Sequence, residues 1–153
     1  MASLSGVNYA KEIAKPQLKI ENGEVYGQVH YLREEYDLSG AVLALNDTIS
    51  GPMLPSGARV LDAAIKVDGS LGTGGILDLG YQASADGGEV ADPNGFIVGA
   101  DAGGAAVLSK MAIGSAALDK KFSESVRTEL VVTEASSVST GVKVSYWIAY
   151  VIN

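Results

Sequence analysis

Residues 53–81, MLPSGARVLDAAIKVDGSLGTGGILDLGY, decide the fold class of this chain. A Pro-Ser-Gly turn opens the stretch, and 58–68 is then rich in Val, Leu, Ile and Ala. A turn rich in Gly and Ser follows, after which 76–81 alternates with the two-residue period of a strand. This pattern predicts a β-hairpin with one buried face and no reactive side chain.

The same alternation closes the chain. Residues 125–133 and 142–152 each place apolar side chains at every second position, and the turn 136–141 lies between them. We therefore expect a terminal antiparallel hairpin. With a further strand-like run at 25–34 and 19 glycines marking tight turns, the sequence predicts an all-β fold, an antiparallel β-sandwich or barrel that is jelly-roll-like.

The domain organisation is predicted to be simple. Residues 1–23 lack sustained alternation and are expected to form an extended N-terminal arm, whereas 24–153 form one β-sandwich domain. An irregular excursion loop is expected at about 82–118, because Gly, Asp and Ala dominate it. Within that loop the pattern predicts a short strand at 96–98 and weakly favours a helix at 105–117.

The composition argues against several classes of function. Eleven basic and eighteen acidic residues give a net charge of −7, which argues against binding to nucleic acid, because phosphate contacts depend on Lys and Arg. The chain has no cysteine, which excludes disulfides, thiolate catalysis and Cys-ligated metals. No signal peptide or apolar membrane span is apparent, so we expect no membrane partner and assembly in a cytoplasm.

No constellation of residues predicts catalysis or a bound cofactor. His30 is the single histidine, and the adjacent carboxylates 34–35 should point to opposite faces of a strand. The glycine clusters 72–75 and 99–104 lack the lysine and spacing of phosphate loops. Oxygen ligands gather in the acidic loop 86–94, where turn formation is the expected role and a calcium site is an open alternative.

Several motifs resemble those of small virion proteins of tailed bacteriophages, the capsid decoration or cement proteins. The opening 6–11 (GVNYAK) resembles the start of that family, and 54–62 (LPSGARVLD) is the most specific part of the likeness. Residues 77–81 (LDLGY) follow at a suitable distance, and 146–151 (YWIAYV) resembles the last strand of the family. These motifs describe turns and packing rather than chemistry.

The resemblance implies a structural role in the virion. Such a protein would bind the major capsid protein on the outside of the icosahedral head, bridge its subunits and stabilise the shell against DNA pressure, often as a homotrimer. The expected arm residues that contact the capsid or a protomer are Val7, Tyr9, Ile13 and Pro16. The expected residues of the contact between copies are Tyr146, Trp147 and Tyr150.

Other interpretations stay open at this point. The arm could instead be a frayed tail. The chain could be another virion part, such as a tail, fibre-base or head–tail protein. It could also be a non-catalytic β-sandwich module that binds a ligand such as carbohydrate, although such sites usually present aromatic platforms. An enzyme is not expected, because the residues for acid–base or nucleophilic chemistry are not grouped.

Overall fold

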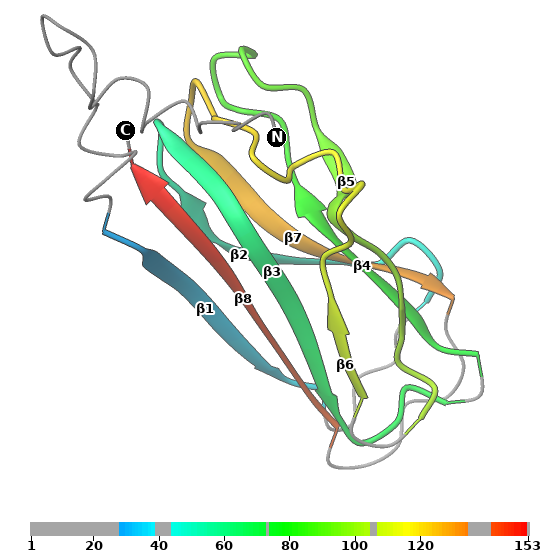
Figure 1. Ribbon diagram of the computed structural model, residues 1–153. Coiled ribbons are helices and arrows are strands. Elements are labelled where there is room, and N and C mark those ends of the chain that lie inside the picture. Colours follow the sequence, from blue (N-terminus) through cyan, green and yellow to red (C-terminus); the bar gives the residue numbers. More distant parts are fainter. Residues whose placement is uncertain (1–27, 39–43, 73, 105–106, 135–141, 153) are drawn as a thin grey trace, which may run out of the picture.

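The computed structural model describes residues 28–38, 44–72, 74–104, 107–134 and 142–152 (Figure 1). Within these ranges every regular element is a β-strand. The eight strands are β1 (His30–Asp37), β2 (Thr48–Leu54), β3 (Ala58–Asp68), β4 (Ile76–Tyr81), β5 (Asp92–Asp101), β6 (Val107–Lys110), β7 (Val126–Glu134) and β8 (Lys143–Ile152).

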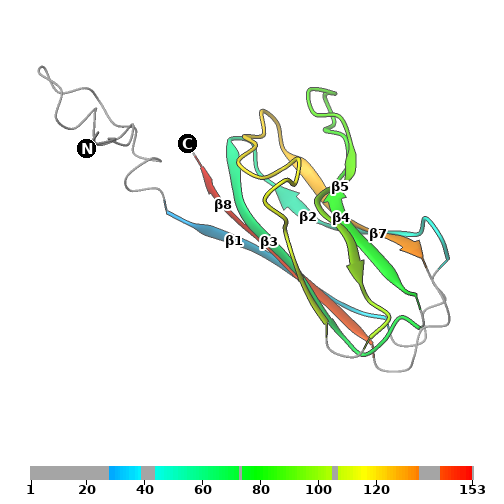
Figure 2. The same cartoon turned by 45° about the vertical axis from the view of Figure 1, so that its right-hand side comes forward.

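The strands form two four-stranded sheets that pack face to face. One sheet, here called the front sheet, has the order β1-β8-β3-β6, and the back sheet has the order β2-β7-β4-β5. Every neighbouring pair is antiparallel. Figure 2 shows the two layers from the side. The prediction of an all-β, jelly-roll-like antiparallel sandwich is confirmed.

Both predicted hairpins are wrong in their pairing, although the strands themselves are present. β3 and β8 belong to the front sheet, whereas β4 and β7 belong to the back sheet. Hairpin loops usually hold about 2–5 residues, but the connections 69–75 and 135–142 are longer and cross between sheets. The alternation is the same in either case, because each strand of a sandwich buries one face whichever strand lies beside it.

The region 82–118 is more regular than predicted. It contains β5 and β6, which are edge strands of the back and front sheets. The predicted short strand at 96–98 is the middle of β5. The weakly favoured helix is wrong where the structure describes it, since 107–110 is strand β6 and turns follow. Four residue pairs with β3 hold 107–110 in a strand, and this segment contains no alanine that would favour a helix.

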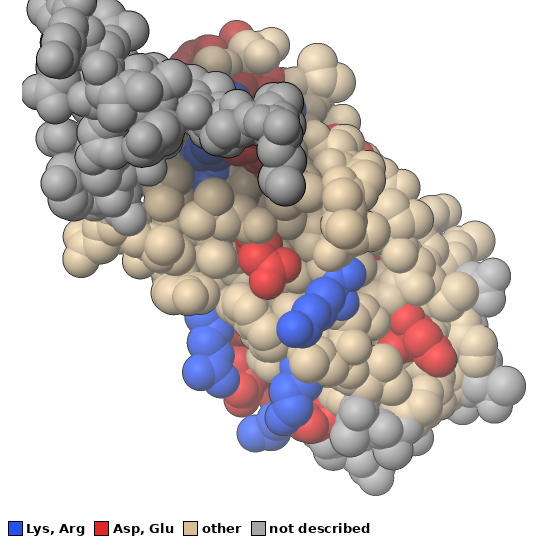
Figure 3. Space-filling model, in the orientation of Figure 1, with Lys and Arg blue, Asp and Glu red and all other residues tan. Residues whose placement is uncertain are grey.

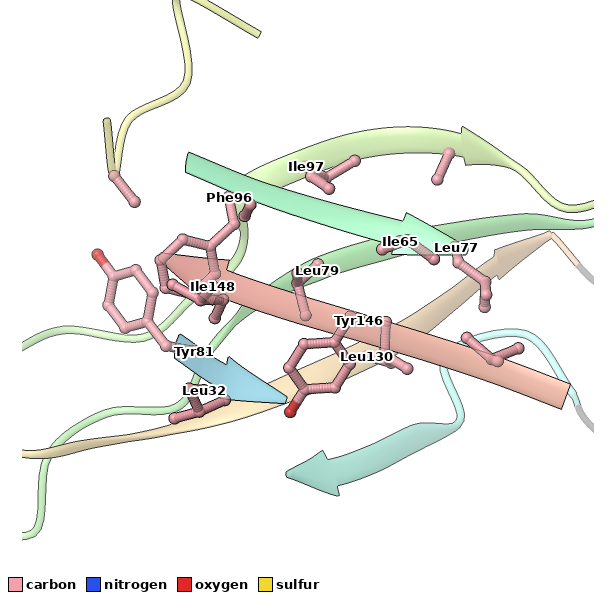
Figure 4. Packing of buried hydrophobic residues seen from close by; sticks show 14 of the residues in the cluster. Leu32, Ile65, Leu77, Leu79, Tyr81, Phe96, Ile97, Leu130, Tyr146 and Ile148 are labelled. Carbon is pink, nitrogen blue, oxygen red and sulfur yellow. The ribbon is translucent and has the colours of Figure 1, made fainter. Parts of the chain in front are cut away.

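The core lies between the sheets and is filled by the inward residues of both (Figure 4). An aromatic group closes one end, where the Tyr81 ring meets the Phe122 ring edge-on at 4.9 Å between centroids and the Phe96 ring at 5.6 Å. Leu79 and Ile65 fill the middle and are fully buried. Interlocking aromatic and aliphatic side chains of this kind supply most of the driving force for folding.

Candidate interaction surface

The outer face of the front sheet carries a shallow hollow of about 420 Å³. The antiparallel register sets Arg33 of β1 opposite Trp147 of β8, and Ser145 of β8 opposite Lys66 of β3. Residues directly opposite in a sheet share a face, so these side chains stand together although β1, β3 and β8 are distant in sequence. The residues that line this cationic hollow are Tyr31, Arg33, Lys66, Ser145 and Trp147.

Small residues beneath the larger side chains leave room for the hollow. Ala64 lies opposite Trp147, and Ala149 lies opposite Tyr31. Both alanines are buried, although their register puts them on the outer face. Tyr31, in contrast, is 70% exposed. The hollow therefore has a floor of regular strands and an aromatic side chain open to solvent.

Basic side chains gather on this outer face. Figure 3 shows them among a few carboxylates and a broad uncharged area. Lys66 Nζ lies 2.7 Å from Asp68 Oδ2, and both side chains are about half exposed. Lys143 Nζ lies 3.8 Å from Glu35 Oε1, farther along β8. Within the described residues Arg33 has no ion-pair partner, and no carboxylate lines the hollow.

A second polar group, here called the loop clamp, lies at the end of the sandwich. It fixes loop 82–91, which connects β4 to β5 and projects from that end in both views (Figures 1 and 2). Glu89 is only 7% exposed, and its Oε1 accepts hydrogen bonds from the Ser123 backbone nitrogen at 2.7 Å and hydroxyl at 2.8 Å. Its Oε2 lies 3.0 Å from Lys120 Nζ.

Lys120 completes the loop clamp. Its ammonium donates to the Tyr81 hydroxyl at 2.7 Å and lies 4.8 Å from the centroids of the Tyr81 and Phe122 rings. Each charge of the clamp is therefore satisfied by groups of the chain itself. A buried ion pair is stable only when such additional hydrogen bonds are present.

The environment of the clamp shifts both ionisation equilibria. Burial by itself raises the pKa of Glu89, but the hydrogen bonds from Ser123 and Lys120 and the charge of Lys120 outweigh it, so that pKa lies below its ordinary value. Burial by itself lowers the pKa of Lys120, but the bonds to Tyr81 and Glu89 outweigh it and raise that pKa. Both groups are thus held in their charged forms.

On the inner face of the front sheet, a chain of hydrogen bonds, here called the relay, runs from Tyr146 through Thr128 to Pro52. Thr128 donates its hydroxyl proton to the Pro52 carbonyl at 2.8 Å, so the Tyr146 hydroxyl, 2.6 Å from Thr128 Oγ1, is the donor to it. A Cβ on Gly51 would overlap that Tyr146 hydroxyl, which explains the absence of a side chain there. Burial raises the pKa of Tyr146, although the bond to Thr128 lowers it in part.

The three residues predicted at the contact between copies lie in different places. The Tyr146 side chain is fully buried in the sandwich, so it presents nothing to a partner, and its inclusion was wrong for that reason. Tyr150 is partly buried against the core and stacks on His30, with ring centroids 5.5 Å apart. Trp147 faces outward in the cationic hollow and stays a predicted contact residue.

Of the other predicted sites, the structure describes the acidic loop, whereas the arm lies outside the described residues. The arm residues Val7, Tyr9, Ile13 and Pro16 all lie outside them. In the acidic loop, Glu89 turns inward to the clamp, and the described residues hold no group of three or more His, Cys, Asp or Glu side chains placed to bind a metal ion. Across the same residues, no helix is long and apolar enough to cross a membrane.

Sequence patterns alone did not reveal the hollow or the clamp. The alternation correctly separates Tyr31 and Arg33 by one residue and sets them on one strand face. It does not say that β1 lies beside β8 or that β8 lies beside β3. The combination of Arg, Trp and Tyr is visible only once that order is known.

Comparisons with known proteins support the fold assignment. No protein-family model and no curated protein sequence matches the chain. Solved structures do match. A chain in the capsid of Ralstonia phage GP4 superimposes with a TM-score of 0.67 and 23% identity, covering 83% of this chain and 86% of that one.

Two further phage capsids contain chains of similar fold. One is the cyanophage Pam1 capsid asymmetric unit, with a TM-score of 0.62, 15% identity, and coverage of 92% of this chain and 96% of that one. The other is the acid-stable capsid of Helicobacter pylori bacteriophage KHP30, with a TM-score of 0.57, 16% identity, and coverage of 84% and 90%. The whole sandwich, and not a fragment of it, is therefore a fold found in phage capsids.

Proposed function

We propose that this chain is a structural protein of a bacteriophage virion, and specifically a capsid decoration protein. It binds the outside of the icosahedral head, bridges subunits of the major capsid protein and stabilises the shell against the pressure of packaged DNA. It assembles in the host cytoplasm and acts on the outer surface of the virion as a homotrimer. It needs no cofactor, performs no catalysis and contacts neither nucleic acid nor membrane.

The main support for the proposal is that this chain is similar in structure to chains of three phage capsids over nearly their full length. Coverage of 83–92% of this chain and 86–96% of those chains means that domains of similar size share one fold. The motifs that resemble decoration proteins point to the same class. A shell role also suits a rigid sandwich, because many modest identical contacts add up when each copy bridges several subunits.

The test is binding to empty heads that lack this chain. Purified protein is mixed with expanded shells of the source phage, the shells are sedimented, and the bound protein is quantified against concentration. The proposal predicts saturable binding at a fixed ratio to the major capsid protein. Binding to isolated tails or to head–tail connectors instead would contradict it and favour another virion component.

The N-terminal residues supply the second part of the proposal. Residues 2–17, which include Tyr9 and Ile13, are proposed to lie on the capsid or on a neighbouring protomer. Deleting them should abolish shell binding and leave the thermal unfolding of the sandwich unchanged. Unchanged occupancy of the shell by the deletion variant would refute this assignment.

A further inference from the structure

The cationic hollow differs from the rest of the molecule in charge. The chain carries a net charge of −7, so two copies repel each other unless basic groups line their contact. Five basic residues lie on the outer face of the front sheet, two on β3 and one on each of the other strands, and the register brings two of the five to the hollow. These five residues are Arg33, Arg59, Lys66, Lys110 and Lys143.

The hollow also has the composition of a protein contact. Arg, Trp and Tyr are the residue types most enriched among residues that dominate binding energy, and Arg33, Trp147 and Tyr31 meet here. The guanidinium of an unpaired arginine matches the geometry of a carboxylate, which it can hold through two hydrogen bonds. The hollow therefore fits a carboxylate that has an apolar group beside it.

Loop 82–91 of the same chain carries both an exposed carboxylate and an exposed apolar side chain. Asp86 is exposed, and Val90 is 78% exposed. The loop clamp holds this loop in place through the buried Glu89. A projecting loop that is already ordered loses little conformational entropy when it binds.

We propose that the cationic hollow of one copy receives loop 82–91 of a second copy. Asp86 of the second copy then lies against Arg33 and Lys66. Val90 of the second copy then lies against Tyr31 and Trp147. The weak, half-exposed pair between Lys66 and Asp68 yields to the new contact at little cost. This inference rests on the self-association in the proposed function and not on shell binding.

The contact joins two different surfaces, and this determines the kind of assembly. Pairing through a two-fold axis would set Arg33 and Lys66 of one copy against the same cations of the other, which is unfavourable. A head-to-tail contact avoids that repulsion and generates a closed ring when the rotation between copies is suitable. A homotrimer is such a ring.

The first experiment measures mass by light scattering coupled to size exclusion at about physiological salt. Arg33→Glu should dissociate the assembly, weakening it by about tenfold or more. Lys143→Glu is the matched control, because it makes the same charge change on the same face outside the hollow, and it should leave the mass unchanged. Asp86→Arg should dissociate the assembly, and the double variant Arg33→Glu with Asp86→Arg should restore it.

Thermal unfolding of each variant separates dissociation from misfolding. Arg33→Ser serves as a milder second variant, and it should lower the mass at low protein concentration while remaining folded. A second measurement uses Trp147, the single tryptophan of the chain. Acrylamide should quench its fluorescence poorly in the assembled protein and strongly in the Arg33→Glu variant.

Specific results would overturn the inference. Equal masses for the Arg33→Glu and Lys143→Glu variants would remove the hollow from the contact. Dissociation by Arg33→Glu without any effect of Asp86→Arg would refute the loop as the occupant. Unchanged mass with lost shell binding would show that the hollow faces the shell instead. A monomeric wild type that still binds shells would refute this contact and leave the proposed shell role standing.

Discussion

The loop clamp and the cationic hollow both contain basic and aromatic residues, but they differ in how completely the chain satisfies them. In the clamp, Glu89 is buried and Lys120 is partly buried, and both have hydrogen-bond partners within the chain. In the hollow, Arg33 is exposed and has no ion-pair partner among the described residues, while Tyr31 is open to solvent. The first arrangement is complete in one copy, whereas the second is suited to a partner.

This contrast separates groups that stabilise the fold from groups available for binding. Removing one member of a satisfied buried pair leaves an unpaired charge in a poorly solvated place, which is costly. Removing an exposed, unpaired charge changes little within the monomer. The clamp also positions the loop that we propose to bind in the hollow, so a stabilising group and a binding group would act on the same contact.

The largest expected effect is on the clamp. Glu89→Ala should lower the free energy of unfolding by about 3 kcal/mol, because Lys120 and the Ser123 amide lose their acceptor. Urea denaturation measures this directly. Asp86→Ala in the same loop is the control, since an exposed aspartate should change stability by less than about 0.5 kcal/mol. Equal effects of the two changes would show that the clamp does not hold the loop.

Acid should act on the same carboxylate. The pKa of folded Glu89 lies below the ordinary value of 4.5, so its contribution to stability is complete above that value and is lost as the pH falls through the folded pKa. Lys120, with a raised pKa, stays charged throughout this window and does not oppose the loss. Unfolding followed from pH 6 to pH 2 should therefore show a fall in stability that Glu89→Gln reduces.

A smaller effect is expected for the relay on the inner face of the front sheet. Tyr146→Phe should lower stability by about 1 kcal/mol, because the tyrosine hydroxyl no longer donates to Thr128 inside the core. Tyr31→Phe on the outer face removes an exposed hydroxyl and should be neutral. Differential scanning calorimetry of the two variants compares the faces of one sheet with the same chemical change.

The smallest effect on the monomer is expected in the hollow. Arg33→Ser should change the unfolding free energy by no more than about 0.5 kcal/mol, measured at a concentration where the protein is monomeric. The same variant should weaken self-association. A large loss of monomer stability would mean that Arg33 supports the fold, and the contrast between clamp and hollow would then fail.

The sequence predicted the strands better than their partners. β3, β4, β7 and β8 could be located because apolar residues recur in each with a period of two, as expected of a strand that packs one face on a core. Their pairing could not be predicted, because connections such as 69–75 can either turn back or cross to the other sheet. Tyr146 was placed at a surface that it does not reach, because 146–151 is apolar on both faces and the sequence does not show which face turns to the core.

The loop clamp and the cationic hollow could not be predicted from the sequence, for a related reason. Glu89 lies between β4 and β5 and Lys120 lies between β6 and β7, so they meet only in the folded sandwich. Arg33 and Lys66 come from strands that share β8 as a neighbour. The local pattern of either segment would be the same without the other. Contacts between distant segments carry no periodic signal that a single sequence displays.

The most direct test of the central claim is a cryo-electron microscopy map of expanded phage heads reconstituted with the purified chain. The account predicts additional density on the outside of the head, bridging major capsid subunits, into which the two-sheet sandwich fits as a ring of three copies. Heads that bind no additional density, or density confined to the tail or the connector, would contradict the account.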